Sequence, residues 1–284
     1  MIAALRMVPA RTRGKARLAR ALLSGMRDRR DVVITLAGGQ RLAVPSLREP
    51  VAWRCLVDGG YEPEIAALIH RFLPRGGVFL DIGANVGVFT IQASGIVGPA
   101  GTVVAVEASP HVNGYLARNI ALNGCANVRH IAMAASDAGP RATPFWPAPD
   151  EHFGMGALAP QFDAEEVTVE ADTIDHILGS LAIGHVDFVK IDAEGFEAAI
   201  LAGARGLLTG DRPPSVVFEF ADWAERRAGR SPGDAQRILL GLGYSLYRLD
   251  PAGRRVPMRD PVETGSADLL ATPRPLPMQD GRRG

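Results

Sequence analysis

From residue 78 onward, short apolar runs alternate with longer amphipathic stretches. Runs this short and this rich in Val, Ile, Leu and Phe predict buried strands, and apolar positions at helical spacing predict helices between them. The predicted strands cover residues 78–81, 102–107, 128–132, 186–191 and 215–220. The predicted helices cover residues 88–96, 110–123, 173–181 and 194–208. This alternation predicts an α/β fold: a doubly wound, Rossmann-like, mostly parallel sheet with helices on both faces.

The region before this alternation predicts a small cap. Residues 32–36 and 41–44 flank a Gly-Gly pair at 38–39, which predicts a β-hairpin. Residues 61–72 then carry apolar side chains at helical spacing and predict a helix. We therefore assign residues 1–58 to a basic N-terminal arm and hairpin cap.

The carboxyl end of the chain predicts the edge of the sheet. Runs at residues 244–249 and 267–271 follow a predicted helix and are joined by a turn-rich stretch, which predicts an antiparallel hairpin. This hairpin and the five earlier strands complete a predicted seven-stranded sheet within one large domain, residues 59–272. The remaining residues, 273–284, have the composition of a disordered tail.

One internal segment follows neither helical nor strand periodicity. Residues 139–160 contain five prolines together with Phe145 and Trp146. A long insertion without a period is either a loop over a functional site or an ordered surface loop. We expect this segment to help choose the substrate, and we find no internal repeats.

Charge narrows the possible partners. The 31 basic residues balance the 31 acidic ones, so net charge gives no reason to expect a nucleic-acid partner. Residues 1–30 nevertheless hold nine Arg or Lys against Asp28 alone, which indicates either a solvated basic helix or an arm that contacts a membrane surface or a partner. No apolar run is long enough to span a bilayer. The two cysteines form no disulfide or zinc pattern, which suits a cytoplasmic protein.

The chemistry begins where the first predicted strand ends, in VFLDIGANVG. A strand, a glycine turn and a helix at the carboxyl edge of such a sheet are typical of a ligand site. A pyrophosphate fingerprint has glycine where Asn85 stands, and Asp81 would repel phosphate charges. A carboxylate instead suits a cationic amine such as that of S-adenosylmethionine. Gly83 and Gly87 permit the sharp turn and close helix packing.

A second acid ends the next strand in register with Asp81. Glu107 follows it by 26 residues, and a carboxylate there can accept both hydroxyl hydrogens of an adenosine ribose. After the third strand, Ser136 and Asp137 either contact an adenine or form a plain turn. Asn123 is interpreted as a helix C-cap.

Four segments resemble the FkbM-type family of S-adenosylmethionine-dependent methyltransferases. They are YEPEIAALIHRFLPRGGVFLDIGANVGVFT, VVAVEASP, HIAMAASD and VDFVKIDAEGFEAAILAGARGLL, and they extend from about Gly59 to Phe220. The K-I-D-x-E-G-x-E segment is the most specific of them. The resemblance implies a class I methyltransferase fold, S-adenosyl-L-methionine as cofactor, and methyl transfer to a hydroxyl of a sugar, glycolipid or natural product.

The resemblance also assigns residues. It implies that the cofactor contacts Asp81, Gly83, Asn85, Gly87 and Glu107, with Ser136 and Asp137 near the base. Tyr61 and Glu62 match the family's Y-E pair and are expected near the methionine end. Many relatives have His where this chain has Phe196, so a histidine base is unavailable there.

The fourth strand brings Lys190, Asp192 and Glu194 to the same carboxyl edge, and strand alternation places Lys190 and Asp192 on one side. One interpretation makes Asp192 or Glu194 the general base or the partner of the acceptor hydroxyl, with Lys190 tuning the carboxylate. The other is an internal ion pair together with an acid that stabilises a helix N-terminus.

Three alternative functions stay open at this point. A metal-assisted methyltransferase would place magnesium between Asp192 and either Glu219 or Asp222, which follow adjacent strands. A non-catalytic protein would bind S-adenosylmethionine and dock through the basic arm. An NAD-dependent oxidoreductase is disfavoured by Asn85 and Asp81.

Overall fold

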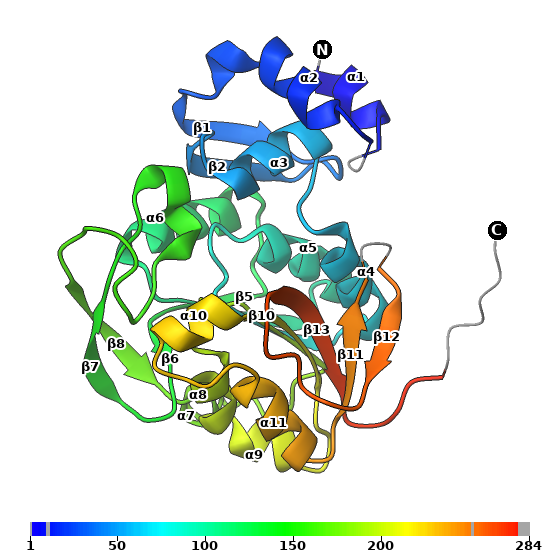
Figure 1. The fold of residues 1–284 in the computed structure, drawn as a ribbon, viewed down its shortest axis with the longest axis vertical. Helices are drawn as coiled ribbons and strands as arrows, with labels where there is room; N and C mark the ends of the chain where they lie inside the picture. The colour runs from blue at the N-terminus through cyan, green and yellow to red at the C-terminus, as the bar shows by residue number, and fades with distance from the viewer. Residues whose placement is uncertain (1, 10–11, 251–252, 278–284) are drawn as a thin grey trace.

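An eight-stranded sheet forms the centre of the molecule. The computed structural model describes residues 2–9, 12–250 and 253–277. The sheet has the order β12-β11-β13-β10-β9-β3-β4-β5 (Figure 1). Its strands are β3 (Val78–Ile82), β4 (Thr102–Glu107), β5 (Val128–Ala132), β9 (Phe188–Ile191), β10 (Ser215–Ala221), β11 (Ser245–Leu249), β12 (Arg255–Met258) and β13 (Ser266–Thr272).

The predicted fold class is confirmed, with one strand more than expected. Strands β5, β4, β3, β9 and β10 run parallel, while β13 and β11 are antiparallel to their neighbours. The turn-rich stretch after β11 itself contributes β12, so the sheet has eight strands instead of seven. Because β4 and β9 lie on opposite sides of β3, their chain crossovers diverge there, which is where such sheets bind ligands.

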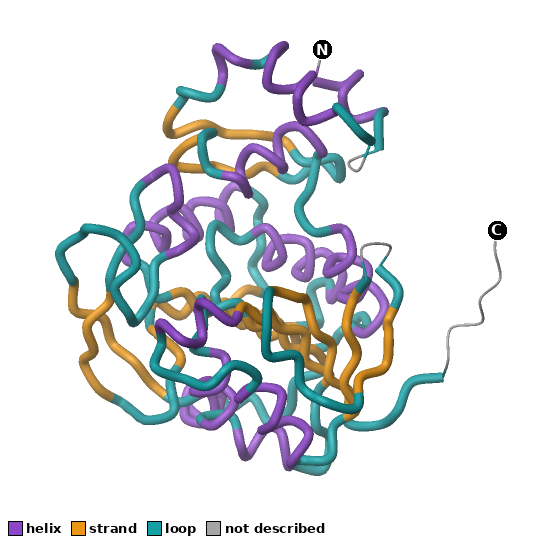
Figure 2. The backbone as a smooth tube through the Cα atoms, viewed as in Figure 1, coloured by secondary structure: helices purple, strands orange, loops and turns teal. Residues whose placement is uncertain are grey.

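Helices cover both faces of this sheet, as Figure 2 shows. On one face lie α4 (Pro63–Phe72), α5 (Val88–Val97) and α6 (Pro110–Leu122); on the other lie α7 (Ile174–Ser180), α8 (Glu197–Ala202), α9 (Arg205–Thr209) and α11 (Asp234–Gly241). Alternate residues of β3 serve the two layers, because Phe79 packs in one apolar cluster and Leu80 in the other. None of the helices in the described residues has the length and apolar character to span a bilayer.

The N-terminal cap contains the predicted hairpin, β1 (Arg30–Thr35) paired with β2 (Arg41–Ser46). Around it lie α1 (Ile2–Met7), α2 (Lys15–Leu22), the short η1 (Ser24–Met26) and α3 (Pro50–Asp58). Asn119 and Asn123 of α6 exchange side-chain hydrogen bonds with the backbone of Ala43 and Arg41 in β2. Asn123 is also the C-cap of α6, as predicted. The cap is therefore fastened to the helix that follows β4.

The segment 139–160 is more ordered than its sequence predicts. It contains β7 (Arg141–Phe145) and η2 (Asp150–Met155), and β7 forms a small sheet with β8 (Val167–Asp172) and β6 (Ala134–Ala135). The prediction of an irregular loop was wrong for β7. Pro144 hides the strand pattern, yet proline is tolerated because β7 is an edge strand of this sheet.

The first residues of the predicted disordered tail, 273–277, are ordered. The backbone N–H of Leu276 donates a hydrogen bond to the Tyr247 hydroxyl at 2.6 Å, which holds the chain after β13 against β11. Residues 278–284 of the predicted tail lie outside the described residues. The remaining element, α10 (Asp222–Arg227), directly follows β10.

Candidate active site

The turn after β3 is built so tightly that only glycine fits at two positions. Gly83 has φ +69°, and a Cβ on it would lie 1.8 Å from the Asp192 carbonyl oxygen. Gly87 has φ +89° and begins α5, where a Cβ would lie 2.7 Å from Leu116 Cδ1. These contacts explain the predicted glycine turn, because the backbone after β3 must approach both the end of β9 and the core of α6.

Asp81 lies beneath this turn and is completely buried. Its Oδ2 accepts a hydrogen bond from the Thr90 hydroxyl at 2.6 Å. Its Oδ1 has no hydrogen-bond partner within the described part of the chain, and Lys190 Nζ lies 3.8 Å away. Burial raises the pKa of Asp81, while the nearby Lys190 ammonium opposes that shift.

Glu107 is fixed at the end of β4 by two backbone donors. Its Oε2 accepts from the Asn85 N–H and its Oε1 from the Ser109 N–H, both at 2.8 Å. Burial raises the pKa of the carboxyl, and these two hydrogen bonds counteract the shift. Each carboxylate oxygen keeps a lone pair that a ligand hydroxyl can use.

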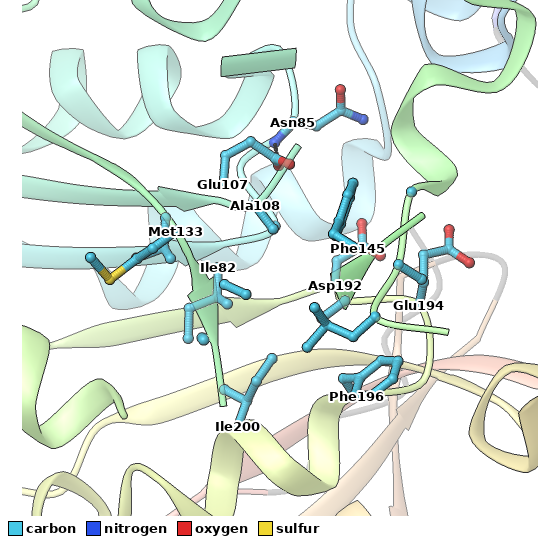
Figure 3. A pocket seen from close by; sticks show the side chains of 18 of the residues that line it. Ile82, Asn85, Glu107, Ala108, Met133, Phe145, Asp192, Glu194, Phe196 and Ile200 are labelled. Carbon is cyan, nitrogen blue, oxygen red and sulfur yellow. Dashed lines mark hydrogen bonds between the residues drawn. The ribbon is translucent and has the colours of Figure 1, made fainter. Parts of the chain in front are cut away.

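A cavity of about 580 Å³ opens at the carboxyl ends of β3, β4 and β9. Figure 3 shows its apolar end around Met133 and its acidic end at Glu194. Its walls come from the strand ends, from the segment after β7 and from the turn after β9. The lining residues are Ile82, Gly83, Asn85, Val106, Glu107, Ala108, Met133, Ala134, Ala135, Phe145, Gly154, Gly156, Ala157, Leu158, Asp192, Ala193, Glu194, Phe196 and Ile200.

Lys190 joins the two strand ends beneath the cavity. Its Nζ donates to the Gly83 carbonyl at 2.8 Å and lies 3.2 Å from Asp192 Oδ2, on the side of the strand that alternation predicts. Burial lowers the pKa of Lys190, but the carboxylates of Asp192, Asp81 and Glu62 outweigh burial and raise it overall. Lys190 therefore stays protonated and acts as a fixed positive charge.

The turn after β9 presents Glu194 to the cavity in a strained conformation. Glu194 has φ +53° and is followed by Gly195 with φ +99°. Glu197, which is buried, accepts hydrogen bonds from the backbone N–H groups of Ala193 and Gly195 and so shapes the turn. Of the three acids in the K-I-D-x-E-G-x-E segment, Asp192 and Glu194 line the cavity, whereas Glu197 supports the turn.

Burial raises the pKa of Glu194 to about 7, and repulsion from Asp192 adds to the shift. Arg227 of α10 opposes the shift, since its guanidinium lies 3.6 Å from Glu194 Oε2 and also donates to the Glu194 carbonyl. A carboxylate with this pKa changes its protonation state near neutral pH, as a general base should.

The decisive comparison is with protein families. Residues 81–246 match the family described as the methyltransferase FkbM domain. The chain belongs to this family. The motifs that suggested the resemblance lie largely inside the matched region, and no curated protein matches the chain.

Solved structures that resemble this FkbM-family methyltransferase include three methyltransferase-fold proteins. Precorrin-6y C5,15-methyltransferase from Geobacter metallireducens is 16% identical, with 74% of this chain and 87% of that chain covered and a TM-score of 0.43. An S-adenosylmethionine-dependent O-methyltransferase from Thermotoga maritima is 14% identical, with 85% and 77% covered and a TM-score of 0.42. Aeropyrum pernix fibrillarin, solved with bound S-adenosyl-L-methionine, is 16% identical, with 84% and 93% covered and a TM-score of 0.43.

Ser136 and Asp137 do not line the cavity of this FkbM-family methyltransferase. The Asp137 carboxylate lies 3.0 Å from the Arg230 guanidinium and 3.6 Å from that of Arg141. Arg141 also donates to the Ser136 hydroxyl. The preceding residues Ala134 and Ala135 of β6 do line the cavity, so the predicted adenine contact of Ser136 and Asp137 stays a prediction.

Glu62 lines a second, smaller cavity instead of the first, and Tyr61 is among the lining residues of neither. Glu62 lines this space of about 270 Å³ with Lys190, Asp192, Glu219 and Asp268, among other residues. Tyr61 packs near the Phe89 ring, with centroids 6.3 Å apart. Burial raises the pKa of Glu62 to about 7 and that of Glu219 to about 9. Asp192 lines both cavities and connects them.

The residues named for the metal-assisted alternative lie partly together. Asp192 and Glu219 both line the second cavity, whereas Asp222 is not among its lining residues. No group of three or more His, Cys, Asp or Glu residues in the described ranges is arranged to hold a metal ion, and the sharing of magnesium by two carboxylates stays a prediction.

Sequence reasoning missed the apolar end of the cavity. Met133, Leu158 and Ile200 line it, although their positions read as ordinary core residues. Phe145 was visible only as part of an aromatic segment, and Phe196 only as a departure from the family pattern. An apolar lining has no signature of its own, because cavity and core use the same residues.

Proposed function

We propose that this chain transfers a methyl group from S-adenosylmethionine to a hydroxyl of a sugar, a glycolipid or a natural product. The observation that carries this proposal is a single cavity lined both by Glu107, after β4, and by Asp192 and Glu194, after β9. A carboxylate suited to a ribose and a carboxylate suited to accept a proton then face the same space. Membership of the FkbM methyltransferase family supports the reaction class.

The cavity fits S-adenosylmethionine part by part. The apolar end around Met133 and Leu158 suits the adenine, and the free lone pairs of Glu107 suit the ribose hydroxyls. Asp192, at the acidic end of the cavity, suits the cationic amine of the cofactor, and the buried Asp81, whose Oδ1 lies 3.8 Å from Lys190 Nζ, lies beneath the turn.

Asp81 thus differs from its predicted role of direct contact. It is buried behind Gly83 and does not line the cavity, so it acts through its charge and by holding the turn with Thr90. Lys190 compensates part of that charge from 3.8 Å. We assign Asp81 and Lys190 to positioning, and Gly83, Asn85 and Glu107 to the walls that touch the cofactor.

We assign the acceptor proton to Glu194. Bound S-adenosylmethionine supplies an electrophilic methyl group, so the chain must align the acceptor oxygen and remove one proton. In this step the hydroxyl oxygen would bond to the methyl carbon while the methyl–sulfur bond breaks and S-adenosylhomocysteine leaves. The O–H bond breaks as well, its electron pair stays on oxygen, and the proton bonds to the Glu194 carboxylate. Glu194 suits this task better than Asp192, because the Asp192 carboxylate is engaged by the Lys190 ammonium 3.2 Å away, whereas burial raises the pKa of Glu194 to about 7.

The proposal is tested by a transfer assay with methyl-labelled S-adenosylmethionine and a panel of sugars, glycolipids and polyhydroxylated natural products. We expect label in an ether that survives alkaline hydrolysis. Calorimetry with S-adenosylhomocysteine and NAD side by side separates the cofactor from the reaction. Preference for NAD would remove the cofactor assignment, whereas tight S-adenosylhomocysteine binding with label only on nitrogen or carbon would remove the O-methylation.

A further inference from the structure

The surface of the cap that lies farthest from the main sheet exposes both arginines and large apolar side chains. Helices α1 and α2 lie at the end of the molecule farthest from the main sheet (Figure 1). On α2, Leu18 is 51% exposed and Leu22, one turn later, is 46% exposed. Met7, at the end of α1, is 86% exposed. Exposed leucines one helical turn apart form an apolar strip that no described residue covers.

The exposed half of α2 also carries arginines, on the side away from this strip, because Arg17 and Arg20 are offset from Leu18 by one and two positions. Arg17 and Arg20 of α2, and Arg13 just before it, are exposed and make no ion pair with any described residue. No acidic residue precedes Asp28 in the chain. Their charges are therefore available to an external anion.

The opposite, inward face of α2 makes its contacts within the cap. Ala19 and Leu23 are buried in a small apolar cluster with Leu5 and Val57. Lys15 is buried too, where its Nζ lies 2.6 Å from Asp58 and donates to the Val8 carbonyl. The helix is thus held in place by its own inner face, and the outer face has no structural task.

We infer that the outer face of α2, defined by Arg13, Arg17, Leu18, Arg20 and Leu22, docks the protein reversibly on an anionic lipid membrane. Leucines that enter the interface beside arginines that pair with lipid headgroups are the pattern of an interfacial helix. A second copy of the chain fits less well, because a symmetric contact would bring arginines against arginines. Nucleic acid would leave the leucines without a partner. This inference goes beyond the methyl-transfer proposal and does not depend on it.

The test is co-sedimentation of the full chain with vesicles of phosphatidylcholine alone and of phosphatidylcholine mixed with phosphatidylglycerol. We expect binding to the mixed vesicles only, and release at high salt as screening shortens the range of the charges. The variant R17Q/R20Q should bind about 25-fold more weakly, at about fivefold per arginine near an anionic surface. The variant L18S/L22S should bind at least about tenfold more weakly.

The matched control is R205Q/R259Q, which removes two exposed arginines without described ion pairs outside the cap. It should bind within about twofold of the unaltered chain, because it leaves the outer face of α2 intact. Thermal melting should be unchanged in all three variants, since the altered side chains are exposed. Failure of the unaltered chain to bind mixed vesicles, or equal losses in the control and R17Q/R20Q, would overturn the inference. So would a dimer that L18S/L22S converts to monomer while vesicle binding persists.

Discussion

At the scale of single residues, Glu107 couples the two strand ends that form the cavity. It holds the backbone of Asn85 and of Ser109 while it keeps lone pairs for a ligand. Glu107→Ala should weaken S-adenosylhomocysteine binding about 5- to 150-fold, because ribose hydroxyls lose a charged acceptor worth about 1–3 kcal/mol. Isothermal titration calorimetry measures the change directly.

Asp137→Asn is the control for this variant, because Asp137 was predicted beside the adenine but lies outside the cavity. Its dissociation constant should match that of the unaltered protein. A Glu107→Ala protein that binds the ligand with normal affinity would show that Glu107 only supports the turn.

The proposed role of Glu194 as proton acceptor predicts a characteristic pH dependence of the reaction rate. Its pKa is raised to about 7, so the carboxylate is protonated below that pH and cannot accept a proton from the acceptor. We expect kcat/KM to fall tenfold per pH unit below about 7 and to level off above it. Glu194→Gln should lower kcat by about 100- to 10,000-fold and abolish this limb of the profile.

Arg227→Gln tests the same assignment by shifting the pKa of Glu194 without removing its carboxylate. Removal of the guanidinium beside Glu194 should raise the pKa of the carboxyl further, which moves the falling limb of the rate profile to higher pH. A profile that keeps its acidic limb in Glu194→Gln would assign the proton to another group, with Asp192 the next candidate.

At the scale of elements, η2 links the cap to the cavity. Arg30 of β1 forms ion pairs with Asp150 and Glu151, and Gly154 of the same element lines the cavity beside Asn85. A Cβ on Gly154 would lie 2.4 Å from Asn85 Nδ2. Gly154→Ala should therefore displace Asn85 or η2 and weaken S-adenosylhomocysteine binding about tenfold, at roughly 1–3 kcal/mol for overpacking.

Gly114→Ala in α6 is the matched control, and we expect it to stabilise the protein instead of disturbing the packing. Its Cβ would meet nothing within 4 Å and the position is an exposed helix interior, so stability should rise by about 0.5–1 kcal/mol with unchanged binding. Chemical denaturation and calorimetry on both variants separate packing at the site from helix propensity. If both variants bind S-adenosylhomocysteine with equal affinity, η2 accommodates the added methyl group at no cost in affinity.

The elements also show why some of the fold was predictable. Strands β3, β4, β9 and β10 are largely buried and appear as mainly apolar runs, whereas β5 is more exposed and more polar; the acids Asp81 and Glu107 followed from register. Strands β7 and β8 escaped prediction because they are half-exposed and β7 is interrupted by Pro144. The placement of Ser136, whose N–H donates to the Asp172 carbonyl, depended on the pairing of β6 with β8, a long-range contact that no local pattern encodes.

At the scale of the molecule, the cap shares one apolar cluster with the glycine turn, with helices α5 and α6 and with η2. Ile34 and Leu42 of the hairpin pack in the same apolar cluster as Val86 and Val88 of the glycine turn and Phe153 of η2. The predicted boundary near residue 58 therefore separates regions of different sequence pattern without separating their packing. Through this cluster, the cap supports both the turn after β3 and the wall of the cavity.

The gathering of acids at the carboxyl edge makes the stability of the whole molecule depend on pH. Burial, followed by repulsion from Asp192, raises the pKa of Glu219 to about 9, above its unfolded value near 4.5. A raised folded pKa stabilises the protein fully below the unfolded pKa, and this stabilisation is lost as pH rises through about 9. The melting temperature should accordingly decline between pH 5 and 9.

Glu219→Gln should flatten that decline, with a gain of roughly 2–4 °C at pH 8 for about 1 kcal/mol. Asp137→Asn should instead lower the melting temperature by a similar amount at every pH from 5 to 9. Although burial raises its pKa, the hydrogen bond and charge of Arg230 lower it overall, so its stabilising contribution is present above the unfolded pKa and disappears in the variant. Melting curves of both variants across this range test the sign, since parallel curves for Glu219→Gln and the unaltered protein would mean that Glu219 is ionised throughout. If the melting temperature instead falls more steeply at alkaline pH in the unaltered protein than in Glu219→Gln, ionisation of the acids at the carboxyl edge destabilises the fold. The fold would then carry this cost at the edge that also holds the proposed proton acceptor.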